Sequence, residues 1–366
     1  MRKKYLENTK RIVVKVGTKS ITGNIKLDPA KIKSLVSQLA GLKKKKYEIV
    51  LVTSGAISAG IGELGLTESP RNIPEKQAAA SIGQIALMAK YHDLFKSFKI
   101  KIGQILLTES DLKDRQKYLN AKNTLITLLR KYDVIPIINE NDVVGIEEII
   151  FGDNDELSAL IANLVDADLL ILLSDVDGFF YKGRVLQLVE KLSSDIMAAA
   201  GDRGDQFSTG GMKSKLNAVK ISINSGIPVI IANHKKEDIL KKVVSGKNEG
   251  TFFCPSEKGL SQKKRWLAYS VVSHGKILID DGAKNALIEM GKSLLPGGIV
   301  KAEGRFNKGE PVDVCDKNGE PFGRGLVNYE RGVVELIKGK KTEQIRSLLK
   351  EKFYTEVIHR DNLVIF

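Results

Sequence analysis

The sequence predicts an α/β protein: a mainly parallel sheet with helices on both faces, followed by a small β-barrel domain. Up to about residue 253, short β-branched segments alternate with longer segments of helical period. Strands that are apolar throughout and separated by helices are typical of a parallel sheet covered on both sides. Beyond that point, short strands and turn signals follow one another closely, which is typical of a small barrel or sandwich.

The expected strands of the first part are six apolar segments, with helices between them. One helix is expected within "LDPAKIKSLVSQLAGLKK", where Asp28 can cap the helix and Pro29 suits its first turn. Ligands of such sheets bind beyond the carboxyl ends of the strands. Polar residues that follow strands are therefore the candidates for function. The expected strands are residues 11–16, 48–54, 100–107, 133–139, 168–174 and 227–233.

Length and texture together predict two domains. A chain of 366 residues is too long for one typical core. Between residues 254 and 270 the pattern changes from alternating strands and helices to short strands with closely spaced turns. We therefore expect a first domain over residues 1–258 that binds the ligands, and a second over residues 259–366 that includes the preceding linker.

Composition narrows the class of protein. The formal net charge of +14 favours an enzyme that handles anions such as nucleotides or dicarboxylates. Cys254 and Cys315 lie far apart and outside any CxxC pattern, and no histidines pair at metal-ligand spacing, so we expect no metal site built by the protein. No apolar run approaches the roughly 20 residues that span a bilayer, and no signal core follows the basic start. A soluble cytoplasmic protein is expected.

Two clusters follow the first two expected strands. The first holds Lys15, Gly17 and Lys19, where a strand end opening through glycine lets N–H groups and a lysine approach an anion. The second is "TSGAISAG", residues 53–60, with Ser54 at the strand tip and small residues opening a helix. A helix start with a hydroxyl can seat a carboxylate or phosphate. Each alone could also be an ordinary turn.

The third cluster combines "NENDVV", residues 139–144, with "FGDNDELSALIA", residues 151–162. So many carboxylates and carboxamides after an apolar strand suit recognition of the ammonium and polar groups of an amino acid. Asp155 could alternatively be the N-terminal cap of a helix. The two roles can coexist.

The fourth cluster is "STGGMKSK", residues 208–215, ahead of a helical stretch. Two glycines before a helix start supply N–H groups directed at a phosphate, and Lys213 and Lys215 supply positive charge. The alternative is a glycine-rich surface loop before a basic helix. "LLSDVDG", residues 172–178, also follows a strand and could border a nucleotide.

Two better-known motifs are excluded by their surroundings. "GKS" at residues 291–293 resembles the end of a P-loop, but the required earlier glycine is Ala286, so a turn is expected. "HRDNLV" at residues 359–364 imitates a protein-kinase catalytic loop, yet the position that needs asparagine is Phe366, the last residue of the sequence.

In this order, the four clusters resemble the amino acid kinase family, and within it the members that phosphorylate L-glutamate. The resemblance covers essentially the whole chain, because the C-terminal part is similar to a PUA domain. "NEND" together with "FGDND" and the appended barrel is the specific part of the resemblance; the single clusters are generic. It implies a three-layer αβα sandwich with a mainly parallel sheet, plus the small PUA-like barrel.

The resemblance also implies the reaction and the site residues. ATP with Mg²⁺ would phosphorylate the side-chain carboxylate of L-glutamate, the first step of proline biosynthesis. Lys15 and Lys215 would stabilise the transferring phosphoryl group, while Asp155 would either orient these lysines or bind the substrate ammonium. The positions matching glutamate contacts are Ser54, Asp142 and Asn154; those matching ATP contacts are Lys15, Ser174, Asp175, Thr209, Gly210, Gly211, Met212, Lys213, Ser214 and Lys215.

Partners are implied in the same way: a homo-oligomer (dimer or tetramer), feedback inhibition by proline, and hand-over of the product to glutamyl phosphate reductase. Two alternatives stay open. A sibling kinase could act on aspartate, N-acetylglutamate or a nucleoside monophosphate. RNA binding through the PUA-like domain is disfavoured, because the basic surplus lies mostly in the first part and no aromatic-rich basic face is evident.

Overall fold

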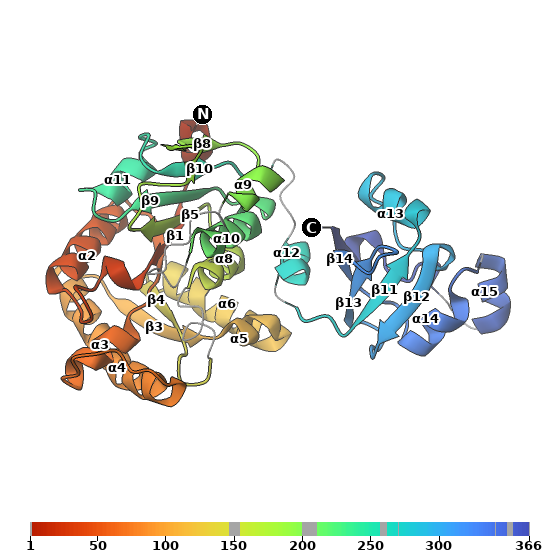
Figure 1. Cartoon of the computed structure of the whole chain (residues 1–366), viewed down its shortest axis with the longest axis horizontal. Helices are drawn as coiled ribbons and strands as arrows, with labels where there is room; N and C mark the ends of the chain where they lie inside the picture. Colours follow the sequence, from red (N-terminus) through yellow and green to blue (C-terminus); the bar gives the residue numbers. More distant parts are fainter. Residues whose placement is uncertain are drawn as a thin grey trace. The chain divides into compact units, whose positions relative to one another are not determined.

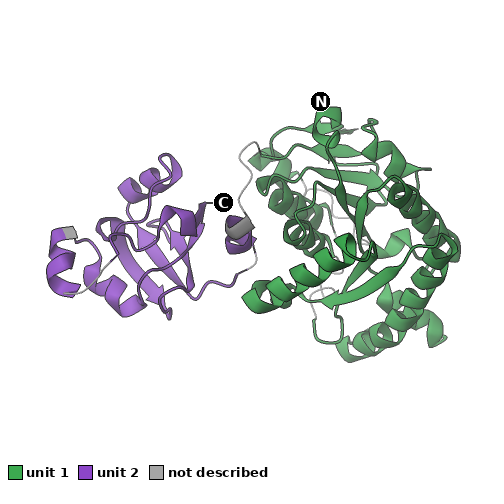
Figure 2. Ribbon diagram, turned by 180° about the vertical axis from the view of Figure 1, so that it is seen from behind, with its two compact units in different colours: residues 1–259 green, residues 260–366 purple. Residues whose placement is uncertain are grey.

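The computed structural model divides into two compact units, residues 1–259 and 260–366 (Figure 2). It describes residues 2–145, 154–199, 211–256, 262–269, 271–340, 342–349 and 354–365. Each unit has its own sheet and its own buried core. Among the described residues, no helix combines the length and the apolar character that crossing a bilayer requires.

The first unit is built on an eight-stranded sheet in the order β3-β4-β2-β1-β5-β9-β10-β8 (Figure 1). The pairs among β1, β2, β3, β4, β5 and β9 are all parallel, which confirms the predicted mainly parallel sheet, and β10 runs antiparallel to β9. The strands are β1 (Arg11–Val16), β2 (Glu48–Val52), β3 (Ile102–Leu107), β4 (Ile135–Glu140), β5 (Leu169–Ser174), β8 (Leu188–Val189), β9 (Val229–Asn233) and β10 (Thr251–Phe253); β6 (Phe180–Tyr181) and β7 (Arg184–Val185) form a separate hairpin.

Helices cover both faces of this sheet. Side chains of α2, α4 and α11 pack against one face in a single apolar cluster, while α6, α8 and α10 cover the other (Figure 1). The alternation of β-branched strands with amphipathic helices therefore gives the three layers that were expected. The helices are α1 (Arg2–Leu6), α2 (Pro29–Lys44), α3 (Ala56–Glu63), α4 (Ile73–Ser97), α5 (Glu109–Lys113), α6 (Arg115–Arg130), α8 (Asp155–Leu164), α9 (Ser194–Ala198), α10 (Met212–Asn224) and α11 (Ile239–Val244).

Local signals place the helices that carry the site. Asp28 caps α2 as predicted, accepting hydrogen bonds from the N–H groups of Ala30 and Lys31. Helices α3 and α4 touch backbone to backbone, because a Cβ added at Gly83 would lie 2.0 Å from the carbonyl oxygen of Ala56. This close approach brings the middle of α4 next to the ends of β2 and β4.

The second unit is a five-stranded sheet in the order β12-β11-β13-β14-β15 around a core of its own. Its helix α12 packs through Leu267 and Ala268 against Val364. The strands are β11 (Gly275–Ile279), β12 (Ile299–Gly304), β13 (Pro311–Cys315), β14 (Pro321–Leu326) and β15 (Leu363–Ile365), and the helices are α12 (Gln262–Tyr269), α13 (Asp281–Ile288), α14 (Arg331–Ile337) and α15 (Thr342–Leu349).

Candidate active site

Predicted site residues gather at one edge of the parallel sheet. Strands β1, β2, β4, β5 and β9 run in the same direction, so their carboxyl ends lie at the same edge (Figure 1). Helices α8 and α10 begin at this edge with Asp155 and Met212. Polar residues at strand ends are thereby brought next to helix N-termini, an arrangement that favours anionic ligands.

The centre of this edge is a buried carboxylate between two lysines. Lys15 Nζ lies 2.8 Å from Oδ1 of Asp155, and Lys215 Nζ lies 3.0 Å from Oδ2. Asp155 is fully buried, and Lys15 and Lys215 are 2% and 7% exposed. One carboxylate therefore holds two cations that come from sequence positions about 200 residues apart. Buried charges are retained only when they are paired in this way.

The capping alternative for Asp155 is wrong. The N-cap of α8 is Asn154, whose side chain makes no capping hydrogen bond, and Asp155 is the first helical residue. Its carboxylate forms ion pairs with Lys15 and Lys215. Its position in the first turn still suits the helix dipole.

Ser54 and Asn154 are brought together beyond the end of β2. Asn154 Nδ2 lies 2.7 Å from the carbonyl oxygen of Thr53, 3.2 Å from Ser54 Oγ and 3.0 Å from Asn139 Oδ1. Ser54 and Asn154 are almost completely buried. Gly55, which follows, has a φ of 100° and caps α3, a left-handed conformation that glycine adopts readily.

Asp142 lies just after β4 and is 5% exposed. Burial, with the nearby charge of Glu140, raises the pKa of the Asp142 carboxyl from 3.8 to about 7. Its Oδ1 accepts no hydrogen bond from the part of the chain that the structure describes. A buried acceptor of this kind is suited to a cationic ligand group.

Ser174 and Asp175 belong to a second group at the end of β5. Lys19 Nζ lies 3.0 Å from Oδ2 of Asp175, and Asn233 at the end of β9 donates to the Asp175 carbonyl oxygen. Burial alone would raise the pKa of Asp175, but the hydrogen bond and charge of Lys19 outweigh burial and lower it. The backbone N–H of His234 donates to the Ser174 carbonyl oxygen and holds His234 beside them, and burial and nearby lysines lower the pKa of its imidazole.

The glycine-rich cluster leads directly into a helix. Helix α10 begins at Met212, earlier than expected, and Gly211 is its N-cap. Its first turn therefore contains Met212, Lys213, Ser214 and Lys215, with Lys213 exposed and Lys215 buried. The N–H groups of Ser214 and Lys215 donate to the carbonyl oxygen of Gly211, whereas the N–H groups that open the helix point out of its N-terminus, where an anion can accept from them. Thr209 and Gly210 lie outside the described residues.

Three residues near the site escaped prediction. Glu140 was part of the "NEND" motif, but its influence on Asp142 depends on burial, which the sequence does not display. His234 follows a predicted strand, and this position was the available signal. Gln84 hydrogen-bonds to Asn139 from the middle of α4, and nothing in its sequence surroundings marks it.

Among the residues that the structure describes, metal-ligating groups do not cluster at this edge. In the described ranges, no cluster of three His, Cys, Asp or Glu side chains could hold a metal ion. Both cysteines are buried free thiols.

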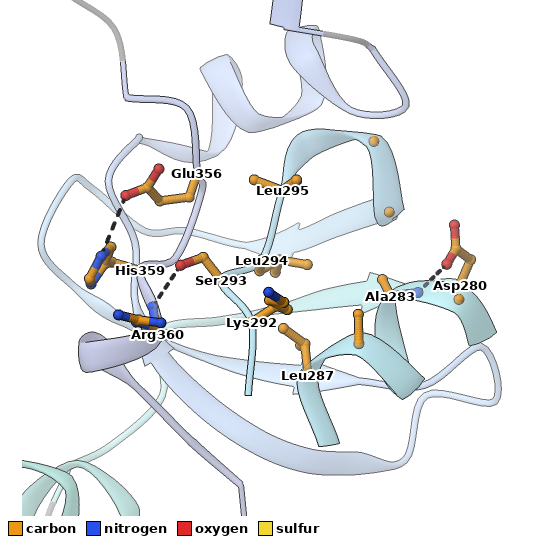
Figure 3. Close-up of a pocket in the computed structure, with 14 residues that line it drawn as sticks. Asp280, Ala283, Leu287, Lys292, Ser293, Leu294, Leu295, Glu356, His359 and Arg360 are labelled. Atoms are coloured by element: carbon orange, nitrogen blue, oxygen red, sulfur yellow. Dashed lines mark hydrogen bonds and ion pairs between the residues drawn. The ribbon is translucent and has the colours of Figure 1, made fainter. Parts of the chain in front are cut away.

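The two excluded motifs meet in the second unit. Lys292 and Ser293 of "GKS" and His359 and Arg360 of "HRD" line the same hollow of about 710 Å³ (Figure 3). Ser293 Oγ accepts a hydrogen bond from the Arg360 backbone N–H at 3.0 Å. None of the predicted site residues lines this hollow. Leu287, Leu294 and Leu295 line it instead, which is not the surface of a P-loop or a kinase loop.

Comparisons with known proteins agree with this architecture. The family model for the amino acid kinase family matches residues 10–233, and that for the PUA domain matches residues 275–349. The glutamate 5-kinase of Caldanaerobacter subterraneus subsp. tengcongensis is 49% identical over 363 residues, covering 97% of each chain. That of Thermoanaerobacter sp. (strain X514) is 47% identical over 363 residues, covering 97% of each chain. That of Syntrophus aciditrophicus is 46% identical over 371 residues, covering 100% of this chain and 96% of its own. The chain therefore belongs to the amino acid kinase family and carries a PUA domain after its kinase domain.

Proposed function

We propose that the chain transfers the γ-phosphoryl group of ATP to the side-chain carboxylate of L-glutamate, giving L-glutamyl 5-phosphate and ADP, the first step of proline biosynthesis. The observation that carries this proposal is the buried group of Lys15, Asp155 and Lys215. Two preorganised cations at the carboxyl edge of the sheet are what a phosphoryl transfer requires. The names of the full-length relatives supply the acceptor.

The reaction needs positioning and charge neutralisation more than proton transfer. A glutamate side chain is ionised at neutral pH, so its oxygen can attack phosphorus without a general base. As the new P–O bond forms, the bond to the bridging oxygen of ADP breaks, and ADP leaves with the electron pair. Lys15 and Lys215 stabilise the negative charge on the phosphoryl oxygens during transfer. Asp155 holds both lysines in position, and this is the alternative that its two ion pairs favour.

The substrate amino acid would be held by Ser54, Asp142 and Asn154. Asp142 Oδ1 and Asn154 Oδ1 are buried acceptors that receive no hydrogen bond from the described residues, and an ammonium group supplies three donors. Ser54 and the start of α3 offer a hydroxyl and N–H groups to the α-carboxylate. Both ends of an amino acid thus find complementary groups.

The nucleotide would lie on the side of β5 and α10. Ser174 and Asp175 border this side, and Lys15 and Gly211 to Lys215 would bind its phosphates; Thr209 and Gly210 complete the proposed set. The basic helix start fits a polyanion. Mg²⁺ on the phosphates would neutralise charge on the transferred group. The nucleotide itself would hold the ion, because both oxygens of Asp155 face lysines.

Several partners belong to the proposal. Exposed apolar side chains support a homo-oligomer, a dimer or a tetramer: Ile85 on α4 is 76% exposed, Ile82 lies three residues before it on the same helix, and Leu106 is exposed on the edge strand β3. Proline, the end product of the biosynthesis that this reaction begins, is proposed as a feedback inhibitor. A glutamyl phosphate reductase would receive the labile acyl phosphate. The proposal includes a cytoplasmic location, where ATP is available.

The proposal is tested by ADP release from MgATP with L-glutamate, L-aspartate, N-acetylglutamate and UMP as separate acceptors. Hydroxylamine is included because it converts an acyl phosphate into a hydroxamate. We expect ADP and hydroxamate with L-glutamate alone, and less of both when proline is added. Turnover of another acceptor instead of glutamate would overturn the substrate assignment.

A further inference from the structure

A chain of three side-chain amides runs from helix α4 into the proposed substrate site. Gln84 Oε1 accepts from Asn139 Nδ2 at 2.9 Å, and Asn139 Oδ1 accepts from Asn154 Nδ2 at 3.0 Å. Asn154 Nδ2 also donates to the carbonyl oxygen of Thr53 at 2.7 Å. Asn139 is 1% exposed and Asn154 is fully buried, so water does not compete for the bond between them, while Gln84 is half-buried.

A backbone carbonyl decides the direction of every bond in the chain. The oxygen of Thr53 can only accept, so Asn154 must turn its NH₂ group toward it. The same NH₂ group faces Asn139, which must therefore present its oxygen and direct its own NH₂ group at Gln84. Gln84 in turn must present Oε1. Reversal of any one amide would set two donors or two acceptors against each other.

The consequence is the orientation of Asn154. The two N–H donors of its amide form the two shorter hydrogen bonds, to the carbonyl oxygen of Thr53 and to Asn139 Oδ1. The Ser54 hydroxyl, at 3.2 Å, therefore remains available to another partner. Its Oδ1 is buried and accepts no hydrogen bond from the described residues. The amide thus offers an acceptor, and not a donor, to a ligand.

We propose that Gln84 and Asn139 are positioning residues that fix the Asn154 amide so that its oxygen accepts from the ammonium group of the amino-acid substrate. The proposal rests on the proposed function, because it assigns a partner to an acceptor in that same site. Gln84 touches no reacting atom. It acts through Asn139, and its effect is confined to substrates that carry an ammonium group.

The test compares L-glutamate with glutarate, which has both carboxylates but no ammonium group. In Gln84→Met, a side chain of similar length replaces the acceptor. In Gln84→Glu, a carboxylate oxygen still accepts from Asn139. Gln38→Met is the matched control, because Gln38 on α2 also makes a hydrogen bond through its side-chain oxygen, to the Leu240 N–H on the far helix α11. Each full-length variant is assayed for kcat and KM, and calorimetry measures the binding of both compounds.

We expect Gln84→Met to lower kcat/KM for glutamate by about tenfold, mainly through KM, and to leave glutarate within about twofold. Gln84→Glu should restore the preference for glutamate to within about threefold, and Gln38→Met should leave it unchanged. The same ratios should appear in the calorimetric affinities. An equal loss for both compounds, or no loss in Gln84→Met, would overturn the positioning role. The unaltered protein tests the proposed function separately: if it neither binds nor phosphorylates glutamate, the proposed function fails. The comparison of the variants tests only the positioning role.

Discussion

Replacing Asp155 by asparagine is the most revealing change to the site. The substitution keeps the shape of the side chain and removes its charge, so Lys15 and Lys215 lose the carboxylate that lies 2.8 Å and 3.0 Å from their ammonium groups. Both lysines remain buried in a site that offers little solvation. Stability and catalysis should therefore fall together.

The burial of all three residues sets the magnitude. Removing one partner of a buried ion pair costs about 3–5 kcal/mol, because the remaining charge is left uncompensated. Here two buried cations lose the carboxylate that they share, and each keeps its other contacts. We expect a loss of at least about 3 kcal/mol in the free energy of unfolding, and a fall in kcat of about 10²-fold or more because the lysines no longer hold their positions.

Urea denaturation measures the first effect, and ADP release at saturating substrates measures the second. Glu109→Gln is the matched control: Glu109 pairs with Lys113 at 2.8 Å, but both side chains are 34% exposed. An exposed pair of this kind contributes about 0–1 kcal/mol. If Asp155→Asn were no more destabilising than the control and kept its kcat, the central role of this carboxylate would be refuted.

Three further predictions follow. The pKa of Asp142, raised to about 7, makes its charged form scarce at pH 6 and dominant at pH 8, so KM for glutamate should fall by about tenfold across that range, and an Asp142→Asn variant should lose this dependence. Lys215→Ala should lower kcat by about 10²-fold or more while the circular dichroism spectrum persists. Gly83→Ala should lower the free energy of unfolding by about 1–3 kcal/mol, because the added Cβ would lie 2.0 Å from the carbonyl oxygen of Ala56. The control Gly41→Ala, where nothing lies within 4 Å of the added Cβ, should raise the free energy of unfolding slightly. Equal melting temperatures for the two variants would contradict the close contact between α3 and α4.

The sequence was most informative where local chemistry decides the structure. Apolar strands separated by helices indicated the parallel sheet, and Asp28 marked a helix start that the structure confirms. The order of strands was beyond prediction, because β4 inserts between β2 and β3 through contacts distant in sequence. The short strands β8 and β10 also lack a pattern long enough to recognise.

The site residues, too, were predictable only where neighbouring residues in the sequence indicate their role. Lys15 and Lys215 could be identified because Lys15 lies near a strand end that opens through Gly17, and Lys215 lies in the helix start that follows Gly210 and Gly211. The sequence could not decide the role of Asp155, since a carboxylate before a helix can cap it or pair with distant cations. Gln84 looked like an ordinary helix residue, and only the glycine-mediated contact of α3 with α4 explains its place beside the site.

The central claim is that a glutamate carboxylate oxygen attacks phosphorus at this site. The most direct test uses L-glutamate labelled with ¹⁸O in its side-chain carboxylate and follows the released phosphate by ³¹P NMR. An acyl phosphate that cyclises through its own amine expels phosphate with the bridging oxygen attached. The account predicts that this phosphate carries one ¹⁸O atom from glutamate. Release of phosphate without the label, at the same rate as ADP, would contradict it.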